Sequence, residues 1–307
     1  MIAWLLTQQI AVLFLMVGCG VLLTKLGILQ SQDGKALSQL SMNLVIPCAI
    51  LNSFQIDYTD DIRNGFLLAV LSTLLIHALL FTLNALLRPV LKLDRVESAS
   101  LIYSNAGNLI IPLVTAVFGP EWVIYASAYM SIQTIFIWTH GQSLLRGTSG
   151  ADWKKIFTNI NLITAVFGIA LFLCKVRLPD IPARAVSSIS AMIGPLSMII
   201  LGILLAEMDW KTVFSKKRIY LVCFLTMLAF PCAVLGLLKL TNIASLVPDG
   251  FTIVLISFLA VITPSASTLP QLALVYDQDA EYAGAINALT TLLCIFTMPL
   301  MVLLYQL

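Results

Sequence analysis

Charged residues are scarce in this chain. Only 10% of the 307 residues are Asp, Glu, Lys or Arg, whereas a soluble globular domain has roughly 25%. Hydrophobic residues make up 60% of the sequence, and the mean hydropathy is +0.99. This composition excludes an ordinary soluble domain and predicts an all-α integral membrane protein that crosses the bilayer many times.

The few charges do not concentrate in one part of the chain. The formal net charge is +2 and is spread along the chain, so there is neither a basic patch for nucleic acid nor an acidic tail. We therefore expect the lipid bilayer, and no nucleic acid, among the partners. Segment 2–23 lacks a basic n-region and a small-residue cleavage site, so we expect it to stay as the first membrane helix.

Signatures of enzyme active sites and metal centres are also absent from the sequence. It contains no H-E-x-x-H, G-x-S-x-G or Walker-type run, and His77 and His140 are its only histidines. Its six cysteines lie in apolar runs without C-x-x-C spacing, which favours small core residues over metal ligands. We expect no enzyme activity, no metal site and no cofactor.

Long apolar runs are abundant. A spanning helix needs about 20 mostly apolar residues, and ten such runs alternate with short polar breaks. They cover residues 3–24, 36–55, 64–88, 97–118, 121–145, 156–174, 184–206, 217–239, 250–276 and 280–305. We predict that each run forms one transmembrane helix.

Lys and Arg are distributed unevenly over the loops. The loops after helices 1, 3, 5, 7 and 9 hold twelve of them, and the loops on the opposite side hold five. Because cytoplasmic loops are enriched in Lys and Arg, this bias predicts that both termini lie outside, on the extracellular or periplasmic side. Lys175, Arg177 and Arg184 are the local exception.

No Asp or Glu falls in the middle of a predicted helix. A sodium site built on a buried carboxylate is therefore not predicted, although carbonyls and amides could still bind a cation. The uncharged helix interiors suit a uniporter, or a carrier driven by protons or by the membrane potential.

Two of the apolar runs are interrupted where the bilayer should be driest. Residues 103–113 read Y-S-N-A-G-N-L-I-I-P-L, and residues 263–271 read T-P-S-A-S-T-L-P-Q. Irregular backbone at this depth is tolerated only where it is buried in protein or lines a cavity. Paired breaks in the two halves of a membrane protein indicate the binding site of a transporter.

The two halves of the chain are related. Five predicted helices precede residue 150 and five follow it, and an odd number in each half requires the halves to be inverted across the membrane. Residues 111–126 align without gaps on residues 269–284, which places Pro112 on Pro270. We therefore predict an inverted repeat of two five-helix units, residues 1–150 and 151–307.

The two interruptions at residues 103–113 and 263–271, called the breaks from here on, have the chemistry of an anion site. A proline can open a helix, so Pro112 and Pro270 are expected to begin half-helices whose first amides lack intrahelical partners. Such an end carries a partial positive charge suited to a carboxylate, and neutral polar side chains surround it. The alternative is a pair of proline-kinked helices whose polar side chains bond to neighbouring helices. The predicted substrate-binding residues are Ser104, Asn105, Asn108, Pro112, Thr263, Pro264, Ser265, Ser267, Thr268, Pro270 and Gln271.

Four further polar residues lie inside predicted helices. His77 either bonds to a neighbouring helix or takes part in proton coupling. Gln133 and Asn287 either bond between helices or contact the ligand. Asn43 either shapes the second helix or lines a cavity.

Three segments carry a resemblance to a known family. S-N-A-G-N-L-I-I-P-L (104–113), T-P-S-A-S-T-L-P-Q (263–271) and A-G-A-I-N-A-L-T-T-L-L-C-I-F-T-M-P-L (283–300) resemble the auxin efflux carrier family of plant PIN transporters and bacterial permeases. The resemblance covers essentially the whole chain. It implies an inverted five-plus-five fold related to the bile-acid sodium symporters, with helices 4 and 9 crossing near the midplane. It also implies a scaffold of helices 1, 2, 6 and 7, a transport domain of helices 3–5 and 8–10, and a homodimer.

The short loop between helices 5 and 6, about residues 146–155, resembles bacterial members and lacks the regulatory loop of the plant proteins. We expect a secondary active or facilitative carrier of a small organic anion, a carboxylate, in the bacterial cytoplasmic membrane. The resemblance implies elevator-type alternating access with the site at the crossover. The alternatives are a sodium-coupled symporter similar to the bile-acid symporters, and a membrane sensor or receptor on a transporter fold.

Overall fold

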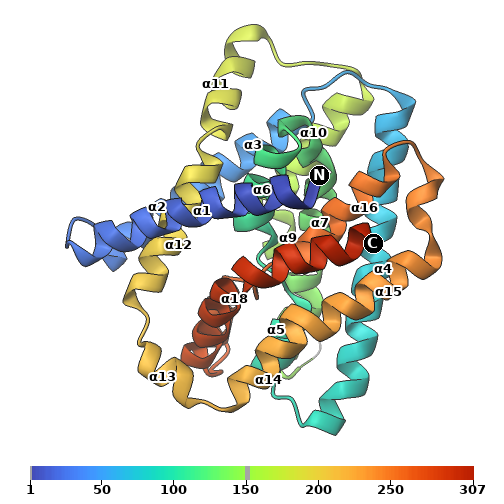
Figure 1. Cartoon of the computed structure of the whole chain (residues 1–307). Coiled ribbons are helices and arrows are strands. Elements are labelled where there is room, and N and C mark those ends of the chain that lie inside the picture. Colours follow the sequence, from blue (N-terminus) through green and yellow to red (C-terminus); the bar gives the residue numbers. More distant parts are fainter. Residues whose placement is uncertain (1, 149–152) are drawn as a thin grey trace.

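Helices make up most of the computed structural model, which describes residues 2–148 and 153–307 (Figure 1). Over these two ranges there is no strand, and the only β-type pairing is an isolated antiparallel bridge between Ser104 and Ser265. The all-α expectation is confirmed. The expected boundary between the halves, at residue 150, lies outside the described residues.

Each predicted apolar run coincides with one helix or with consecutive helices. In the first half these are α1 (Ile2–Lys25), α2 (Ser31–Leu40), η1 (Ser41–Val45), α3 (Ile46–Ser53), α4 (Asp60–Leu91), α5 (Arg95–Ile102), η2 (Ala106–Ile110), α6 (Ile111–Val117), η3 (Pro120–Trp122), α7 (Val123–Phe136), η4 (Ile137–Gly141) and α8 (Gln142–Arg146). In the second half they are α9 (Trp153–Phe157), α10 (Ile160–Leu173), α11 (Asp180–Ser190), α12 (Ile193–Glu207), α13 (Trp210–Ser215), α14 (Arg218–Phe224), η5 (Leu225–Ala229), α15 (Phe230–Thr241), η6 (Ile243–Leu246), α16 (Gly250–Val261), α17 (Leu269–Val275) and α18 (Ala280–Gln306).

Several of these helices have the length and composition of membrane spans. Among the described residues, five helical stretches are long and apolar enough to cross a bilayer: Gln32–Ser53, Asp60–Leu91, Asp180–Glu207, Arg218–Thr241 and Ala280–Gln306. Shorter apolar helices accompany them. The chain is a multi-pass membrane protein.

Three π-helical turns accommodate prolines inside helices. The turns η1, η2 and η5 each end two residues before a proline, at Pro47, Pro112 and Pro231. A proline ring clashes with the carbonyl four residues back, and a π-turn widens the helix at that point. The helix therefore continues through each proline. The prediction that Pro112 begins a half-helix is wrong, because the helix already starts at Ala106.

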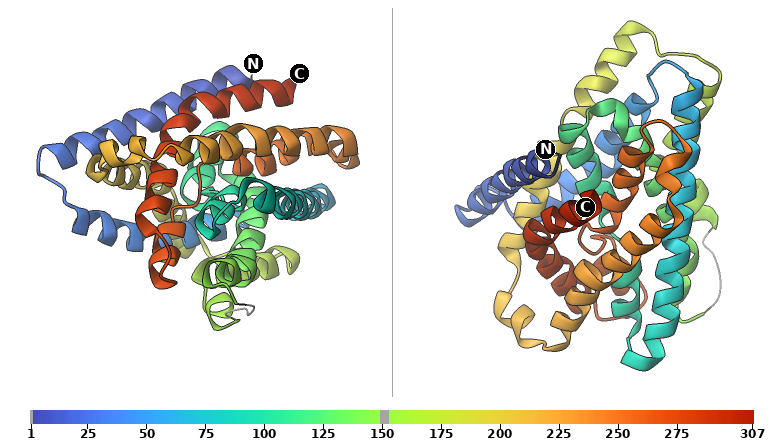
Figure 2. Two further views of the ribbon diagram at one scale, coloured as in Figure 1. Left: turned by 90° about the horizontal axis from the view of Figure 1, so that it is seen from below. Right: turned by 45° about the vertical axis from the view of Figure 1, so that its right-hand side comes forward.

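The packing of the helices can be described as two groups that also contact each other, for example where α1 lies beside α18. Figure 2 shows the chain from two further directions. In the first group, α1 packs on α12, α2 on α12, and α3 on α10 and α11. Glycines permit the closest of these contacts, since a Cβ on Gly202 would lie 2.2 Å from the carbonyl oxygen of Val17. In the second group, α4, α7 and α16 pack on one another, and α18 packs on α14 and α17. The helix η2–α6 contacts both groups.

An ion pair between a buried carboxylate and a partly exposed guanidinium joins helix ends in the second group. The Glu97 side chain is 0% exposed and accepts hydrogen bonds from both Nε and Nη2 of Arg218, the latter at 2.9 Å. The Tyr282 hydroxyl donates to the same carboxylate at 3.1 Å. Arg218 also donates to the carbonyls of Leu91 and Lys92 at 2.8 and 2.7 Å. These hydrogen bonds compensate the desolvation of the carboxylate and tie together the ends of α4, α5, α14 and α18.

Candidate functional site

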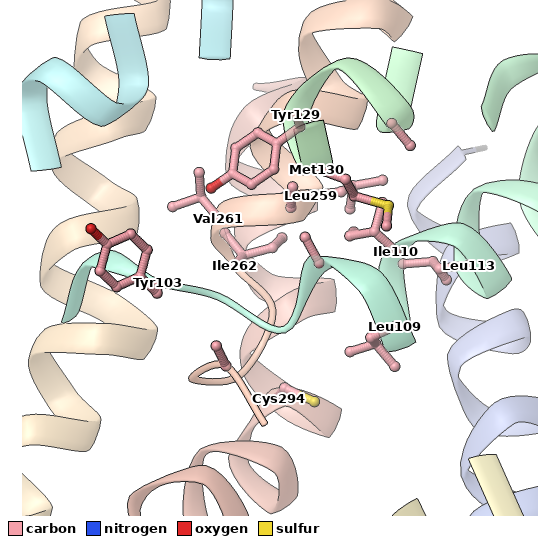
Figure 3. Packing of buried hydrophobic residues seen from close by; sticks show 14 of the residues in the cluster. Tyr103, Leu109, Ile110, Leu113, Tyr129, Met130, Leu259, Val261, Ile262 and Cys294 are labelled. Atoms are coloured by element: carbon pink, nitrogen blue, oxygen red, sulfur yellow. The ribbon is translucent and has the colours of Figure 1, made fainter. Parts of the chain in front are cut away.

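The two interrupted segments lie side by side and pair through their backbones. In Figure 3 the non-helical chain that follows Tyr103 passes beside the chain that leaves α16 at Val261 and Ile262. The amide of Asn105 donates to the carbonyl of Pro264 at 2.7 Å, and the amide of Ala266 donates to the carbonyl of Tyr103 at 2.9 Å. This pairing satisfies backbone groups that the broken helices leave open.

Gln133 of α7 holds the first break. Its Oε1 accepts hydrogen bonds from the amide and the hydroxyl of Ser104, at 3.1 and 3.0 Å. Its Nε2 donates to the carbonyl of Ser104 at 2.9 Å. A single buried amide side chain therefore fixes both peptide groups of this serine.

Two side chains of α18 hold the second break in the same way. The Thr290 hydroxyl accepts a hydrogen bond from the amide of Ser265 at 3.2 Å, and Nδ2 of Asn287 donates to the carbonyl of Ser265. In both halves the central serine of the break is thus held by the long helix that follows the interrupted one.

A chain of side-chain hydrogen bonds connects the breaks. Asn108 donates through Nδ2 to the hydroxyl of Ser267 at 3.0 Å, and that hydroxyl donates to Oδ1 of Asn105 at 3.2 Å. The Asn105 amide group keeps its two Nδ2 donors without a partner among the described residues.

A cavity of about 120 Å³ opens at this point between the two helix groups. It has room for several waters, and hence for a small organic molecule. Among the described residues no charged side chain lines it. Thr268 is one of the lining residues, and its buried hydroxyl has no hydrogen-bond partner in the described part of the chain. The lining consists of Met42, Ile46, Ser104, Asn105, Gly107, Asn108, Met130, Gln133, Thr134, Ile137, Trp138, Asn159, Asn161, Ala266, Ser267 and Thr268.

The beginning of the η2–α6 helix forms part of the cavity wall. This helical stretch runs over Ala106–Val117, and the amides of its first turn have no acceptor within the helix. Gly107 exposes the backbone there, since a Cβ at this position would meet only the end of Met130, at 3.6 Å. The helix dipole and these amides favour a negatively charged ligand.

The structure brings only part of the predicted site into the cavity. Ser104, Asn105, Asn108, Ser267, Thr268 and the supporting residue Gln133 line it. Pro112, Thr263, Pro264 and Ser265 are buried outside it, and Pro270 is the second residue of α17, as expected for a proline that opens a helix.

Three predicted residues point elsewhere. Gln271 is exposed. Asn43 is exposed and donates to the carbonyl of Gln39 at 2.9 Å, one turn back in its own helix. His77 is buried beside Tyr129 and Phe136, with Nδ1 2.9 Å from the carbonyl of Thr73.

Sequence reasoning missed the far wall of the cavity. Asn159 and Asn161 lie at the start of α10, in the helix group opposite the breaks. The predicted sixth helix began at residue 156 and absorbed both asparagines, whereas Asn159 actually caps α10 by accepting from the amides of Asn161 and Leu162. The polar N-I-N triplet at positions 159–161 was the available signal.

Comparison with known proteins identifies the family of the chain. Residues 5–152 and 144–302 match the family described as membrane transport protein, which is the auxin efflux carrier type. The chain belongs to this family. The resemblance to this family is thereby confirmed, and membership in the family makes the chain a membrane transporter. No curated protein matches it.

Proposed function

We propose that this transporter carries a small organic anion, a carboxylate, as a secondary active or facilitative carrier, and that the anion binds in the crossover cavity. The observation that carries the proposal is the pair of Nδ2 donors of Asn105, which have no hydrogen-bond partner among the residues that the structure describes. Asn105 lines a cavity walled by neutral hydrogen-bonding groups at a helix start. Neutral donors can bind a carboxylate reversibly, without the strong retention that a buried Lys or Arg would impose.

The two helix groups support an elevator-type mechanism. The cavity wall takes Met42, Ile46, Asn159 and Asn161 from the first group, and its other lining residues come from α7, η4 and the two interrupted segments. We propose that the first group, helices 1, 2, 6 and 7 of the inverted repeat, is a scaffold in a homodimer. Sliding of helices 3–5 and 8–10 along it would expose the cavity on alternate sides. A bifunctional cross-link between cysteines at Leu109 and Leu201, which border one small cavity between the groups, is expected to stop transport until it is cleaved.

Uptake into proteoliposomes tests the function. Purified protein is expected to accumulate at least one of radiolabelled succinate, benzoate and indole-3-acetate with saturable kinetics, relative to empty liposomes. Each substrate is measured with and without sodium, a pH gradient and a membrane potential. Saturable flux separates a carrier from a sensor, and flux only in the presence of sodium would favour the sodium-coupled symporter instead.

A further inference from the structure

A second, smaller cavity borders the breaks. Its volume is about 10 Å³, which is room for one occupant of the size of a water molecule. Its walls come from the end of α5, the end of α16 and the π-turn η5, and η5 packs on α5. We propose that this cavity binds one small monovalent cation, such as sodium.

Two buried hydroxyl groups at this cavity have no hydrogen-bond partner among the described residues. They belong to Ser100 of α5 and Thr226 of η5, which are 1% and 6% exposed. Other helical threonines, among them Thr73 and Thr290, donate to the carbonyl four residues earlier. Thr226 makes no such bond in the described structure. The oxygens of Ser100 and Thr226 are therefore available to a ligand.

The end of α5 adds two backbone carbonyls. In a continuing helix the carbonyl of Ser100 would accept from the amide of Ser104, but that amide donates to Gln133. The carbonyl of Leu101 would accept from the amide of Asn105, but that amide donates to the second break. Both carbonyls belong to lining residues, and neither accepts a hydrogen bond from the described residues.

The end of α16 adds a third carbonyl. Val261 is the last residue of this helix and lines the cavity. The amide four residues later, that of Ser265, donates to the hydroxyl of Thr290 instead of continuing the helix. The carbonyl of Val261 therefore also accepts no hydrogen bond from the described part of the chain. Together, five neutral oxygens without a partner belong to residues around a cavity for a single occupant.

This set of groups favours a cation over a water molecule. Three of the five oxygens are carbonyls, which can only accept, whereas a water molecule donates only two hydrogen bonds. Both helices also bring their C-terminal ends, which carry partial negative charge. Free carbonyls and helix C-termini are the groups that coordinate sodium in transporters with broken helices. Such a site has none of the Cys, His or carboxylate ligands by which a metal centre is recognised in a sequence.

The proposed cation site lies beside the crossover cavity, because Ser104 lines both cavities. A positive charge here would therefore also favour an anion bound at the crossover. This consequence rests on the function proposed above, whereas the cation site itself does not.

The experiment measures the thermal stability of the purified full chain in detergent without substrate. The wild type and four variants are melted in about 200 mM sodium chloride and in the same concentration of choline chloride, whose cation is too large for the cavity. Ser100→Ala and Thr226→Val each remove one of the five oxygens. The matched controls are Ser98→Ala and Thr291→Val, since both hydroxyls are buried and without a described partner but do not line this cavity.

The wild type should melt roughly 3 to 5 °C higher in sodium chloride than in choline chloride, as mass action predicts for a Kd of about 10 mM. Both control variants should keep this difference. In Ser100→Ala and Thr226→Val, binding that is about tenfold weaker should reduce the difference to less than about 2 °C. The difference between the two salts is compared, so a change in the melting temperature of a variant itself does not affect the result.

Equal melting temperatures of the wild type in the two salts would assign the cavity to a bound water and overturn this inference. A sodium effect of the same size in all five proteins would also overturn it, because the cation would then bind elsewhere. Either result leaves the proposed carboxylate transport intact, since no substrate is present. Failure of carboxylate uptake in proteoliposomes would in turn leave the cation site intact.

Discussion

Asn105 and Asn108 are the residues at which the two breaks meet, because both reach Ser267 of the second break from the first. The sequence identified them through a physical conflict, since amide side chains inside an apolar run need partners. The sequence also identified Gln133 as a candidate, but it did not indicate that this side chain hydrogen-bonds to the backbone of Ser104. The Asn-Ile-Asn triplet could have indicated Asn159 as a helix cap, but not as part of the cavity wall, because contacts between the two helix groups depend on packing over distances that no local pattern encodes.

We predict that Asn105→Ala raises the KM for a transported carboxylate about ten- to a hundredfold, because a hydrogen bond to a charged ligand contributes roughly 1.5 to 3 kcal/mol. Asn108→Ala should act similarly by releasing Ser267. Asn43→Ala is the matched control, since Asn43 bonds only within its own helix. Proteoliposome uptake measures all three, and wild-type kinetics for both cavity variants would remove these residues from the site.

We predict that Gln133→Leu destabilises the fold itself. The substitution leaves the amide, carbonyl and hydroxyl of Ser104 without their present partner in a buried position, which should cost about 3 kcal/mol or more. The apparent melting temperature in detergent should fall by roughly 5 °C or more. Gln271→Leu, the same change at an exposed position, should leave both melting temperature and uptake near wild type, and an equal loss in the two variants would contradict the role assigned to Gln133.

At the scale of elements, the apolar runs predicted where the helices lie, because length and hydropathy dominate in a bilayer. Ten membrane-spanning helices stay a prediction, since five helical stretches of the described residues are long and apolar enough to cross a bilayer. The interruptions were also found in the right segments. The start of the first half-helix was misplaced by six residues, from Pro112 to Ala106. Proline lacks an amide hydrogen, and its ring clashes with the preceding turn of a helix. A chain can accommodate it either by starting a helix at the proline or by forming a π-turn before it. Nothing in the residues next to Pro112 and Pro270 distinguishes these two solutions.

Pro112 lies inside a continuous helix and Pro270 at a helix start, so replacing them should have different effects on transport. In Pro112→Ala the π-turn η2 can tighten to α-helical geometry, which would rotate Asn105 and Asn108 relative to Ser267 and raise the KM for a carboxylate. In Pro270→Ala the helix start at Leu269 is retained by the break before it, so KM should change less. The test is to compare the KM for uptake of a carboxylate by Pro112→Ala with that by Pro270→Ala. A larger effect at Pro270 than at Pro112 would contradict the π-turn interpretation.

At the scale of the whole molecule, the charge bias of the loops gives a testable orientation. We predict both termini outside and Lys154 and Lys217 inside the cell. In a variant without native cysteines, Lys154→Cys and Lys217→Cys should resist a membrane-impermeant maleimide added to intact cells and react after permeabilisation. Asp57→Cys, in the loop after α3, should react in intact cells. Labelling of Lys154→Cys from outside would reverse the orientation.

The measurement that tests the crossover site most directly is protection of one cavity position by substrate. Thr268→Cys, in a chain whose six native cysteines are replaced, puts a thiol in the cavity wall at a hydroxyl that makes no hydrogen bond to the described residues. Gln271→Cys puts one three residues further along, at an exposed position outside the cavity. A transported carboxylate, chosen from succinate, benzoate and indole-3-acetate, should slow maleimide labelling at position 268 in proportion to its occupancy and leave position 271 unaffected. Equal labelling rates at position 268 with and without saturating substrate would contradict binding at the crossover.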